Sequence, residues 1–70
     1  MSGQELRAAR RAAGISQDEL SVLLGMSQTM LSRIEQGMRA APDDMRERLQ
    51  RAVDHHEAER RRRLRDFSLA

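Results

Sequence analysis

The stretch from residue 28 to residue 36 carries hydrogen-bonding side chains at helical spacing. They occupy the first turn and the outer side of a helical wheel: Gln28, Thr29, Ser32, Arg33 and Gln36. An amide can form paired hydrogen bonds with adenine, a guanidinium can do so with guanine, and threonine offers a hydroxyl or a methyl group. No acidic residue lies among these outward positions. The pattern favours a helix that reads base edges in the major groove of DNA, and the alternative is an ordinary solvated polar face.

Glycines and capping residues divide the chain into short helices that would position this face. Segments of helical spacing end at three glycines: Gly14, Gly25 and Gly37. Serines in N-cap positions begin three segments: Ser2, Ser16 and Ser27. Pro42 followed by two aspartates begins a fourth. We therefore expect helices at about residues 3–13, 17–24, 28–36 and 43–53.

The segment from Ser16 to Gln36 has the layout of a helix-turn-helix. A short capped helix ends at Gly25, a tight turn follows, and the helix with the polar face begins after Ser27. In such a unit the first helix lies across the DNA backbone and the second enters the major groove. Because no strand pattern appears anywhere in the sequence, the predicted fold class is all-α.

Apolar positions predict one small core shared by these helices. The expected core residues are Leu6, Ala9, Ala13, Ile15, Leu20, Leu23, Leu24, Met26, Leu31, Ile34, Leu49 and Val53. Arg10 and Glu35 also fall on apolar faces, where a lone buried charge would be strongly destabilising. We expect the two to pair and to tie the first helix to the third. The alternative is that both lie at the edge of the core with their charged ends in water.

Length and composition restrict the function classes. The chain of 70 residues allows one domain, and a domain this small buries only about 60% of the surface that its unfolded chain exposes, which favours an oligomer. The lack of cysteine excludes disulfides, thiolate metal sites and cysteine nucleophiles. No apolar run approaches the roughly 20 residues of a membrane span, and Arg7, Arg10 and Arg11 interrupt the first apolar stretch. We expect a cytoplasmic protein that is not an enzyme, because so small a core leaves little room for a deep cleft.

Positive charge gathers toward the C-terminus. All thirteen basic residues are arginines; residues 1–50 hold seven of them with seven acids, and residues 51–70 hold six with four acids. We divide the chain into a helix-turn-helix domain at residues 1–53 and an Arg-rich extension at 54–70. The extension could continue the fourth helix, form a fifth or fray, and it could mediate dimerisation or lie on DNA as a basic arm. Dimer contacts are predicted at Val53, Leu64 and Phe67.

The segment GISQDELSVLLGMSQTMLSRIEQG is similar to the Cro/phage-repressor-like helix-turn-helix family, often called XRE-like. The resemblance covers about residues 4–53, and its pattern runs through Arg10, Gly14, Ser16, Gln17, Leu20, Leu24, Gly25, Ser27, Gln28, Leu31, Ser32, Arg33, Ile34, Glu35, Gly37 and Pro42. It implies a lambda-repressor-like bundle of four to five short helices that binds double-stranded operator DNA, usually as a homodimer. It also implies a prokaryotic or phage protein associated with the nucleoid.

The resemblance further implies roles for single residues. Those implied to read bases are Gln28, Thr29 and Arg33. Those implied to contact the DNA backbone are Gln17, Ser32 and Gln36. A recurrent ion pair of the family corresponds to Arg10 and Glu35, and the loop after Gly37, often basic in the family, supplies only Arg39 for phosphates. Three positions expected to be exposed are apolar here: Val22, Met30 and Met38.

Two functions of different classes follow from these features. The first is a sequence-specific DNA-binding regulator of transcription, a small repressor that binds an operator of two half-sites as a homodimer. The second is a protein-interaction module of the same fold, an antitoxin or an antagonist of another regulator; the arginine run also allows RNA binding. Neither function needs a cofactor. No metal site is expected, because His55 and His56 point about 100° apart on a helix and no cysteine completes a zinc site.

Overall fold

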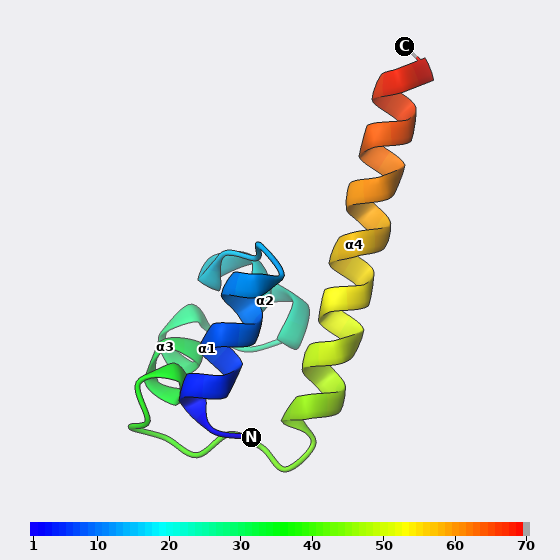
Figure 1. The fold of residues 1–70 in the computed structure, drawn as a ribbon. Coiled ribbons are helices and arrows are strands. Elements are labelled where there is room, and N and C mark those ends of the chain that lie inside the picture. Colours follow the sequence, from blue (N-terminus) through cyan, green and yellow to red (C-terminus); the bar gives the residue numbers. More distant parts are fainter. Residues whose placement is uncertain (70) are drawn as a thin grey trace.

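The computed structural model describes residues 1–69, which form four α-helices and no strand. The helices are α1 (Gly3–Ala12), α2 (Gln17–Leu24), α3 (Gln28–Glu35) and α4 (Met45–Leu69). The first three helices and the beginning of α4 form a small body, from which the rest of α4 projects alone (Figure 1). The predicted all-helical fold class is confirmed. None of the four helices described combines the length and apolar character required for a membrane span.

The predicted capping residues begin the first three helices. Ser2 and Glu5 form a full capping box, in which the Ser2 hydroxyl accepts from the Glu5 amide and the Glu5 carboxylate accepts from the Ser2 amide, both at 3.1 Å. Ser16 and Ser27 each accept a hydrogen bond from a backbone amide three residues later. Gly25 ends α2 in the left-handed region at φ 68°, a conformation that glycine adopts without the steric cost of a Cβ atom.

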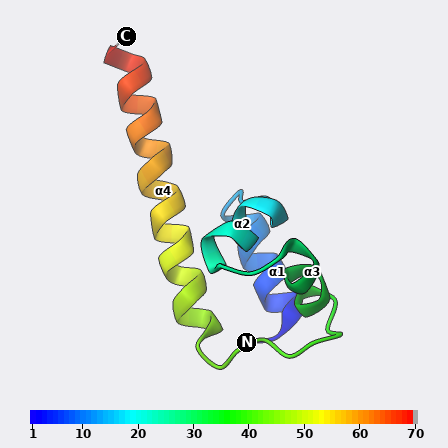
Figure 2. The ribbon, with the colours of Figure 1, turned by 180° about the vertical axis from the view of Figure 1, so that it is seen from behind.

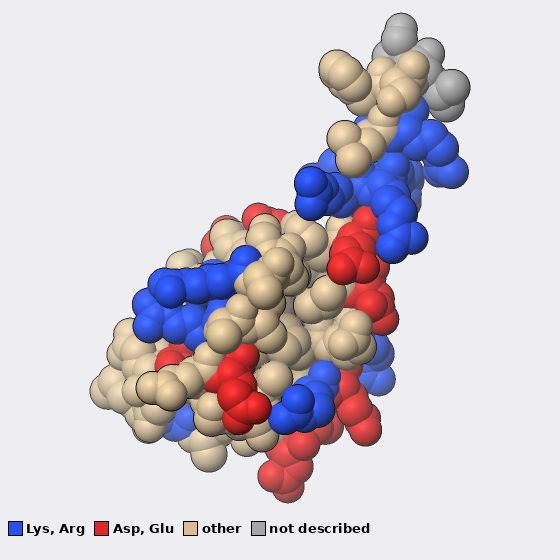
Figure 3. All heavy atoms as spheres, viewed as in Figure 1, with Lys and Arg blue, Asp and Glu red and all other residues tan. Residues whose placement is uncertain are grey.

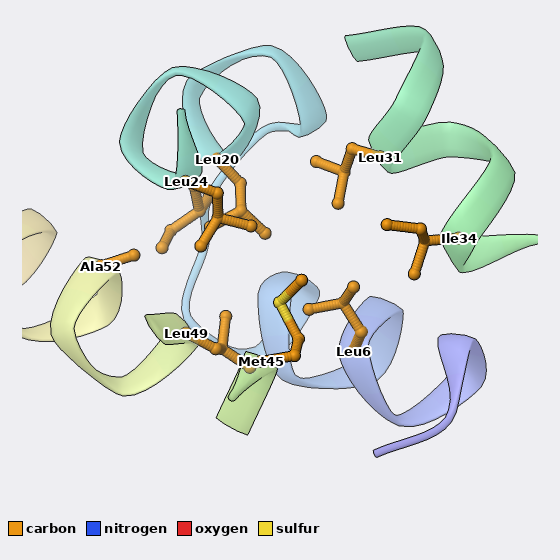
Figure 4. Close-up of a cluster of buried hydrophobic side chains, with 9 residues drawn as sticks. Leu6, Leu20, Leu24, Leu31, Ile34, Met45, Leu49 and Ala52 are labelled. Atoms are coloured by element: carbon orange, nitrogen blue, oxygen red, sulfur yellow. The ribbon is translucent and has the colours of Figure 1, made fainter. Parts of the chain in front are cut away.

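One hydrophobic core joins the four helices, and Figure 4 shows side chains from all of them converging on it. The buried apolar residues are Leu6, Ile15, Leu20, Leu24, Leu31, Ile34, Met45, Leu49 and Ala52. Partly buried residues packed against it include the predicted Ala9, Ala13, Leu23, Met26 and Val53. Met30, expected to be exposed, also packs partly buried against this core, whereas Val22 and Met38 are exposed as expected. Met45 and Ala52 were not among the predicted core residues, although both are buried and Met45 is fully so.

Gly3 permits a close approach between α1 and the end of α3. A Cβ atom at this position would lie 2.0 Å from the backbone oxygen of Ile34 and 3.0 Å from that of Glu35. Backbone oxygens cannot swing aside as the end of a flexible side chain can. The absence of a side chain at Gly3 therefore sets how closely α3 packs on α1.

The fourth helix differs from the prediction at its start. It begins at Met45 rather than at residue 43, because Asp43 and Asp44 form a turn in which the Met45 amide donates to the Pro42 carbonyl at 3.0 Å. Near the start of α4, Arg48 donates to the Leu24 carbonyl at the end of α2.

The predicted extension continues this same helix. Among the open alternatives, a continuation of the fourth helix is the one observed, with α4 running unbroken through residue 69. Ala70 lies outside the described residues. At about 1.5 Å per residue, a helix of 25 residues is about 37 Å long, which accounts for the elongated 46 × 20 × 19 Å extents of the molecule.

Candidate nucleic-acid interface

Helices α2 and α3 pack on each other around a short turn. After the left-handed Gly25, the Met26 amide donates to the Ser21 carbonyl at 3.0 Å and reverses the chain. Ser21 is buried, and its hydroxyl donates to the Asp18 carbonyl at 2.7 Å, so its polar group is satisfied within α2. This arrangement leaves one side of α3 facing away from the body.

The inward side of α3 is fixed by three buried residues: Leu31, Ile34 and Glu35. The first two insert into the core from α3 (Figure 4). Because the remaining positions of α3 point elsewhere on the wheel, Gln28, Thr29 and Arg33 are exposed, as is Gln36 just beyond the helix. Ser32 is half-buried, and its hydroxyl accepts a hydrogen bond from the Gln36 amide group at 3.1 Å.

These side chains line a single open depression of about 450 Å³. Its lining residues are Gln17, Gln28, Thr29, Ser32, Arg33, Gln36 and Met38. The structure thus brings together every residue predicted to contact DNA except Arg39, which is exposed but does not line the depression. Sequence reasoning had not included Met38 in the interface; its signal is an exposed apolar side chain directly after Gly37.

A chain of polar contacts connects this depression with the interior. The Arg10 guanidinium donates to both carboxylate oxygens of Glu35, from Nε at 2.8 Å and from Nη2 at 3.0 Å. The side-chain amide of Gln17 donates from Nε2 to the Glu35 carboxylate at 3.4 Å. The side-chain amide of Gln28 donates in turn to Oε1 of Gln17 at 3.5 Å. The first residue of α2 and the first residue of α3 are therefore linked to one buried carboxylate.

Burial makes the pairing of Arg10 with Glu35 necessary. The exposed fractions of the two side chains are only 11% and 3%, so neither charge is solvated as it would be at the surface. The hydrogen bonds that Arg10 donates to Glu35 raise the pKa of Arg10 above its ordinary value and keep the guanidinium charged. A further bond from Arg10 Nη1 to the Ile15 carbonyl, at 3.1 Å, holds the loop between α1 and α2 to the same group.

The depression carries little charge of its own. Among the described residues that line it, Arg33 is the one charged side chain, and the others offer amides, hydroxyls or a thioether. Helix α3 has no acidic residue in its first turn to repel an anion. Hydrogen bonding rather than net charge is therefore what this surface offers to a duplex.

The two adjacent histidines lie away from this surface. His56 Nδ1 lies 3.6 Å from the Glu19 carboxylate, so that α4 contacts α2 at this point, and His55 is exposed. Within residues 1–69, no three side chains of His, Cys, Asp or Glu are grouped so that they could hold a metal ion.

Comparison with known proteins identifies one family. A family model described as helix-turn-helix matches residues 6–52. This range contains all of α2 and α3, most of α1 and the start of α4. No curated protein and no solved structure matches the chain.

Proposed function

The chain belongs to the XRE-like helix-turn-helix family of DNA-binding regulators, and from this premise we propose that it is a sequence-specific repressor of transcription that binds an operator of two half-sites as a homodimer. The observation that carries this proposal is the open depression on α3, where Gln28, Thr29 and Arg33 are exposed together. In the proposed complex α3 lies in the major groove and these three side chains read base edges.

The surroundings of α3 suit contacts with the DNA backbone. Gln17 is the first residue of α2, where unpaired backbone amides favour an anion such as phosphate. Ser32 and Gln36 lie at the rim of the same depression, and Arg39 follows in the exposed loop. In this scheme Gln17, Ser32, Gln36 and Arg39 fix the register of the protein on the duplex and carry no base preference themselves.

The low charge of the body favours a dimeric complex. Residues 1–50 hold as many acids as arginines, and phosphate contacts normally supply much of the affinity for DNA. Two copies double the number of arginines presented to one operator. The half-sites of such an operator are expected about 34–36 Å apart, one turn of the duplex.

Selection of binding sites from random duplex DNA by the full chain tests this function directly. We expect one enriched motif with two related halves, and we expect Arg33→Ala to lower affinity by about 1–3 kcal/mol while relaxing preference at one position. Arg51→Ala, an exposed arginine on α4, serves as the matched control and should leave the preference unchanged. If no motif is enriched, the proposal fails, and an equal loss on all DNA sequences would make Arg33 a phosphate contact.

A protein-interaction module of the same fold is the second candidate function. Val22 and Met38 are 74% and 73% exposed, which is high for apolar side chains, and the neutral body weakens attraction to DNA. An antitoxin or an antagonist of another regulator would use such apolar surface. In the same selection this candidate predicts that no DNA is retained at any salt concentration.

A further inference from the structure

The projecting part of α4, residues 57–69, lies far from α3. Figures 1 and 2 show it at the opposite end of the molecule from α3 in views that differ by half a turn. Two of its apolar residues are left in solvent: Leu64 is 58% exposed and Phe67 is 82% exposed. A helix that exposes such residues away from the DNA-facing side is a surface for a protein partner rather than an arm along the bound duplex.

A regular seam runs along one face of α4. Val53, Glu57, Arg60, Leu64 and Phe67 follow one another at spacings of four, three, four and three residues. This alternation is the heptad spacing that places side chains on one stripe of a helix facing a second helix. Val53 is half-buried at the edge of the body, whereas the other four are exposed.

The charges of the seam are ordered along the helix. Acidic residues precede the arginine run, so that Glu57 comes before Arg60 on the same stripe. Figure 3 shows the arginines gathered on the projecting part of α4, with acidic side chains directly below them. Glu57 and Arg61 approach to 3.7 Å within the helix, but the pair is solvent-exposed and holds neither side chain strongly.

We propose that this seam binds the same seam of a second copy of the chain, with the two α4 helices antiparallel. In one antiparallel register Val53 faces Leu64 of the other copy, and Glu57 faces Arg60 of the other copy. By symmetry each of these contacts occurs twice, so the apolar pairs flank the charged pairs. The part of the seam from Val53 to Leu64 is thus complementary to itself in this direction, and Phe67 extends past it to lie beside Gln50 of the other copy.

A parallel arrangement of the same seam brings like charges together. Glu57 would face Glu57 and Arg60 would face Arg60, and like charges in contact across an interface are unfavourable. The antiparallel direction is therefore chosen by the order of charges along α4, and the apolar residues add contact area at both ends.

The inference rests on the homodimer of the proposed function but not on its reading of DNA. It assigns the dimer contacts to Val53, Glu57, Arg60 and Leu64, and it leaves the depression on α3 free. Its test is made on the protein without DNA, so that its failure is distinguishable from a failure to find an operator.

Charge reversal on the full chain tests the direction of the pairing, with association measured by analytical ultracentrifugation. Glu57→Arg and Arg60→Glu each turn two attractive contacts into two repulsive ones, and we expect the dimer dissociation constant to rise at least tenfold for either. The double variant, and an equal mixture of the two single variants, should associate like the wild type. Arg65→Glu makes the same charge change on another face of α4, beside Arg61 and Arg62, and should have little effect.

Cysteine cross-linking tests the register, since the chain has no cysteine of its own. A mixture of Val53→Cys and Leu64→Cys chains should form a mixed disulfide, while neither variant alone should cross-link. Two copies of the same position would be offset by 11 residues, about 16 Å along the helix, whereas a disulfide needs Cβ atoms about 3.5–4.5 Å apart. Circular dichroism establishes that each variant is folded.

Three results would overturn the proposal. One is a wild-type chain that stays monomeric at all concentrations used, and another is single charge reversals that associate as the wild type does. The third is cross-linking of Leu64→Cys with itself, which would indicate a parallel pair. None of these results bears on whether Arg33 reads a base.

Discussion

The Arg10 guanidinium on α1 and the Glu35 carboxylate on α3 form two hydrogen bonds, of 2.8 and 3.0 Å, between residues that are 25 positions apart in the chain. Gln17 reaches the same carboxylate from α2 at 3.4 Å. One buried carboxylate is therefore shared by side chains of α1 and α2 while its own backbone belongs to α3. The orientation of α3 depends on this group, and so does the direction in which the polar face points.

Removal of Glu35 should strongly destabilise the fold. In Glu35→Ala the Arg10 charge stays largely buried without its partner, which typically costs about 3–5 kcal/mol. For a domain of this size each 1 kcal/mol shifts the melting temperature by roughly 4–8 °C, so we expect a decrease of at least about 12 °C in thermal unfolding followed by circular dichroism.

Two further variants separate the buried pair from ordinary surface charge. Arg46→Ala breaks the Arg46–Glu5 pair, whose side chains are 70% and 57% exposed, and should cost less than about 1 kcal/mol. The double variant Arg10→Met/Glu35→Leu removes both charges and should be more stable than Glu35→Ala. Equal losses for Glu35→Ala and Arg46→Ala would mean that burial does not govern the pair.

Replacement of Gly3 by alanine should destabilise the protein, although alanine has a higher helix propensity than glycine. Alanine is favoured over glycine by up to about 1 kcal/mol in an exposed helix. Here the new methyl group would meet the Ile34 and Glu35 backbone oxygens, so α1 and α3 must move apart, at a cost of about 1–3 kcal/mol. Urea unfolding of the variant and of the wild type measures the sign of the change in the free energy of unfolding.

Ala8→Gly calibrates this result. Ala8 is exposed in the same helix, so the substitution reports propensity alone and should cost up to about 1 kcal/mol. A Gly3→Ala variant more stable than the wild type would show that the α1–α3 approach relaxes without loss.

The features that were predictable from sequence are those with a local signal. Ser2, Ser16 and Ser27 cap helices through hydrogen bonds that span three residues, and Gly25 ends α2 for a steric reason that lies in the residue itself. The polar face of α3 follows from helical periodicity in the same way. Such features require no knowledge of what the rest of the chain does.

The features that were missed depend on contacts between distant segments. Met45 is a single apolar residue between aspartates and arginines, so periodicity does not mark it, yet it is fully buried. The approach of Gly3 to Ile34 arises only when α1 and α3 pack. The length of α4 was left open because residues 54–66 contain neither a stop signal nor enough apolar residues to require a helix.

The contribution of Glu5 to stability should depend on pH. Its hydrogen bonds with the Ser2 amide and hydroxyl lower its pKa below the ordinary value of 4.5, because they favour the ionised form in the folded state. Its stabilising effect is therefore fully present above the unfolded pKa and is lost as the pH falls through the lower, folded pKa.

Comparison with Glu5→Gln isolates this effect. Glutamine can keep the capping-box hydrogen bond but does not titrate, so the advantage of the wild type should be present at pH 7 and shrink below pH 4.5. Urea unfolding midpoints of the two proteins at several pH values between 3 and 7 measure it. An advantage that stays constant down to pH 3 would contradict the role assigned to the carboxylate.

Replacement of Gln17 or of Arg39 by alanine should weaken DNA binding, and the two variants should differ in how their affinity depends on salt concentration. Both are proposed to contact phosphate, so each alanine variant should lose affinity about equally on preferred and scrambled DNA. Gln17 is uncharged and displaces no counterion, so Gln17→Ala should leave the slope of log affinity against log salt concentration unchanged. Arg39→Ala should reduce its magnitude by about 0.9, the value for one phosphate neutralised.

Fluorescence anisotropy on one selected site and one scrambled site, over a salt series, distinguishes the two variants. Arg51→Ala again serves as the control, because its side chain is exposed on α4 away from the depression. A Gln17→Ala variant that loses preference at one base position, rather than affinity for all DNA, would indicate that Gln17 acts by orienting Gln28, to which it is hydrogen-bonded at 3.5 Å. In that case its phosphate contact would be replaced by a positioning role.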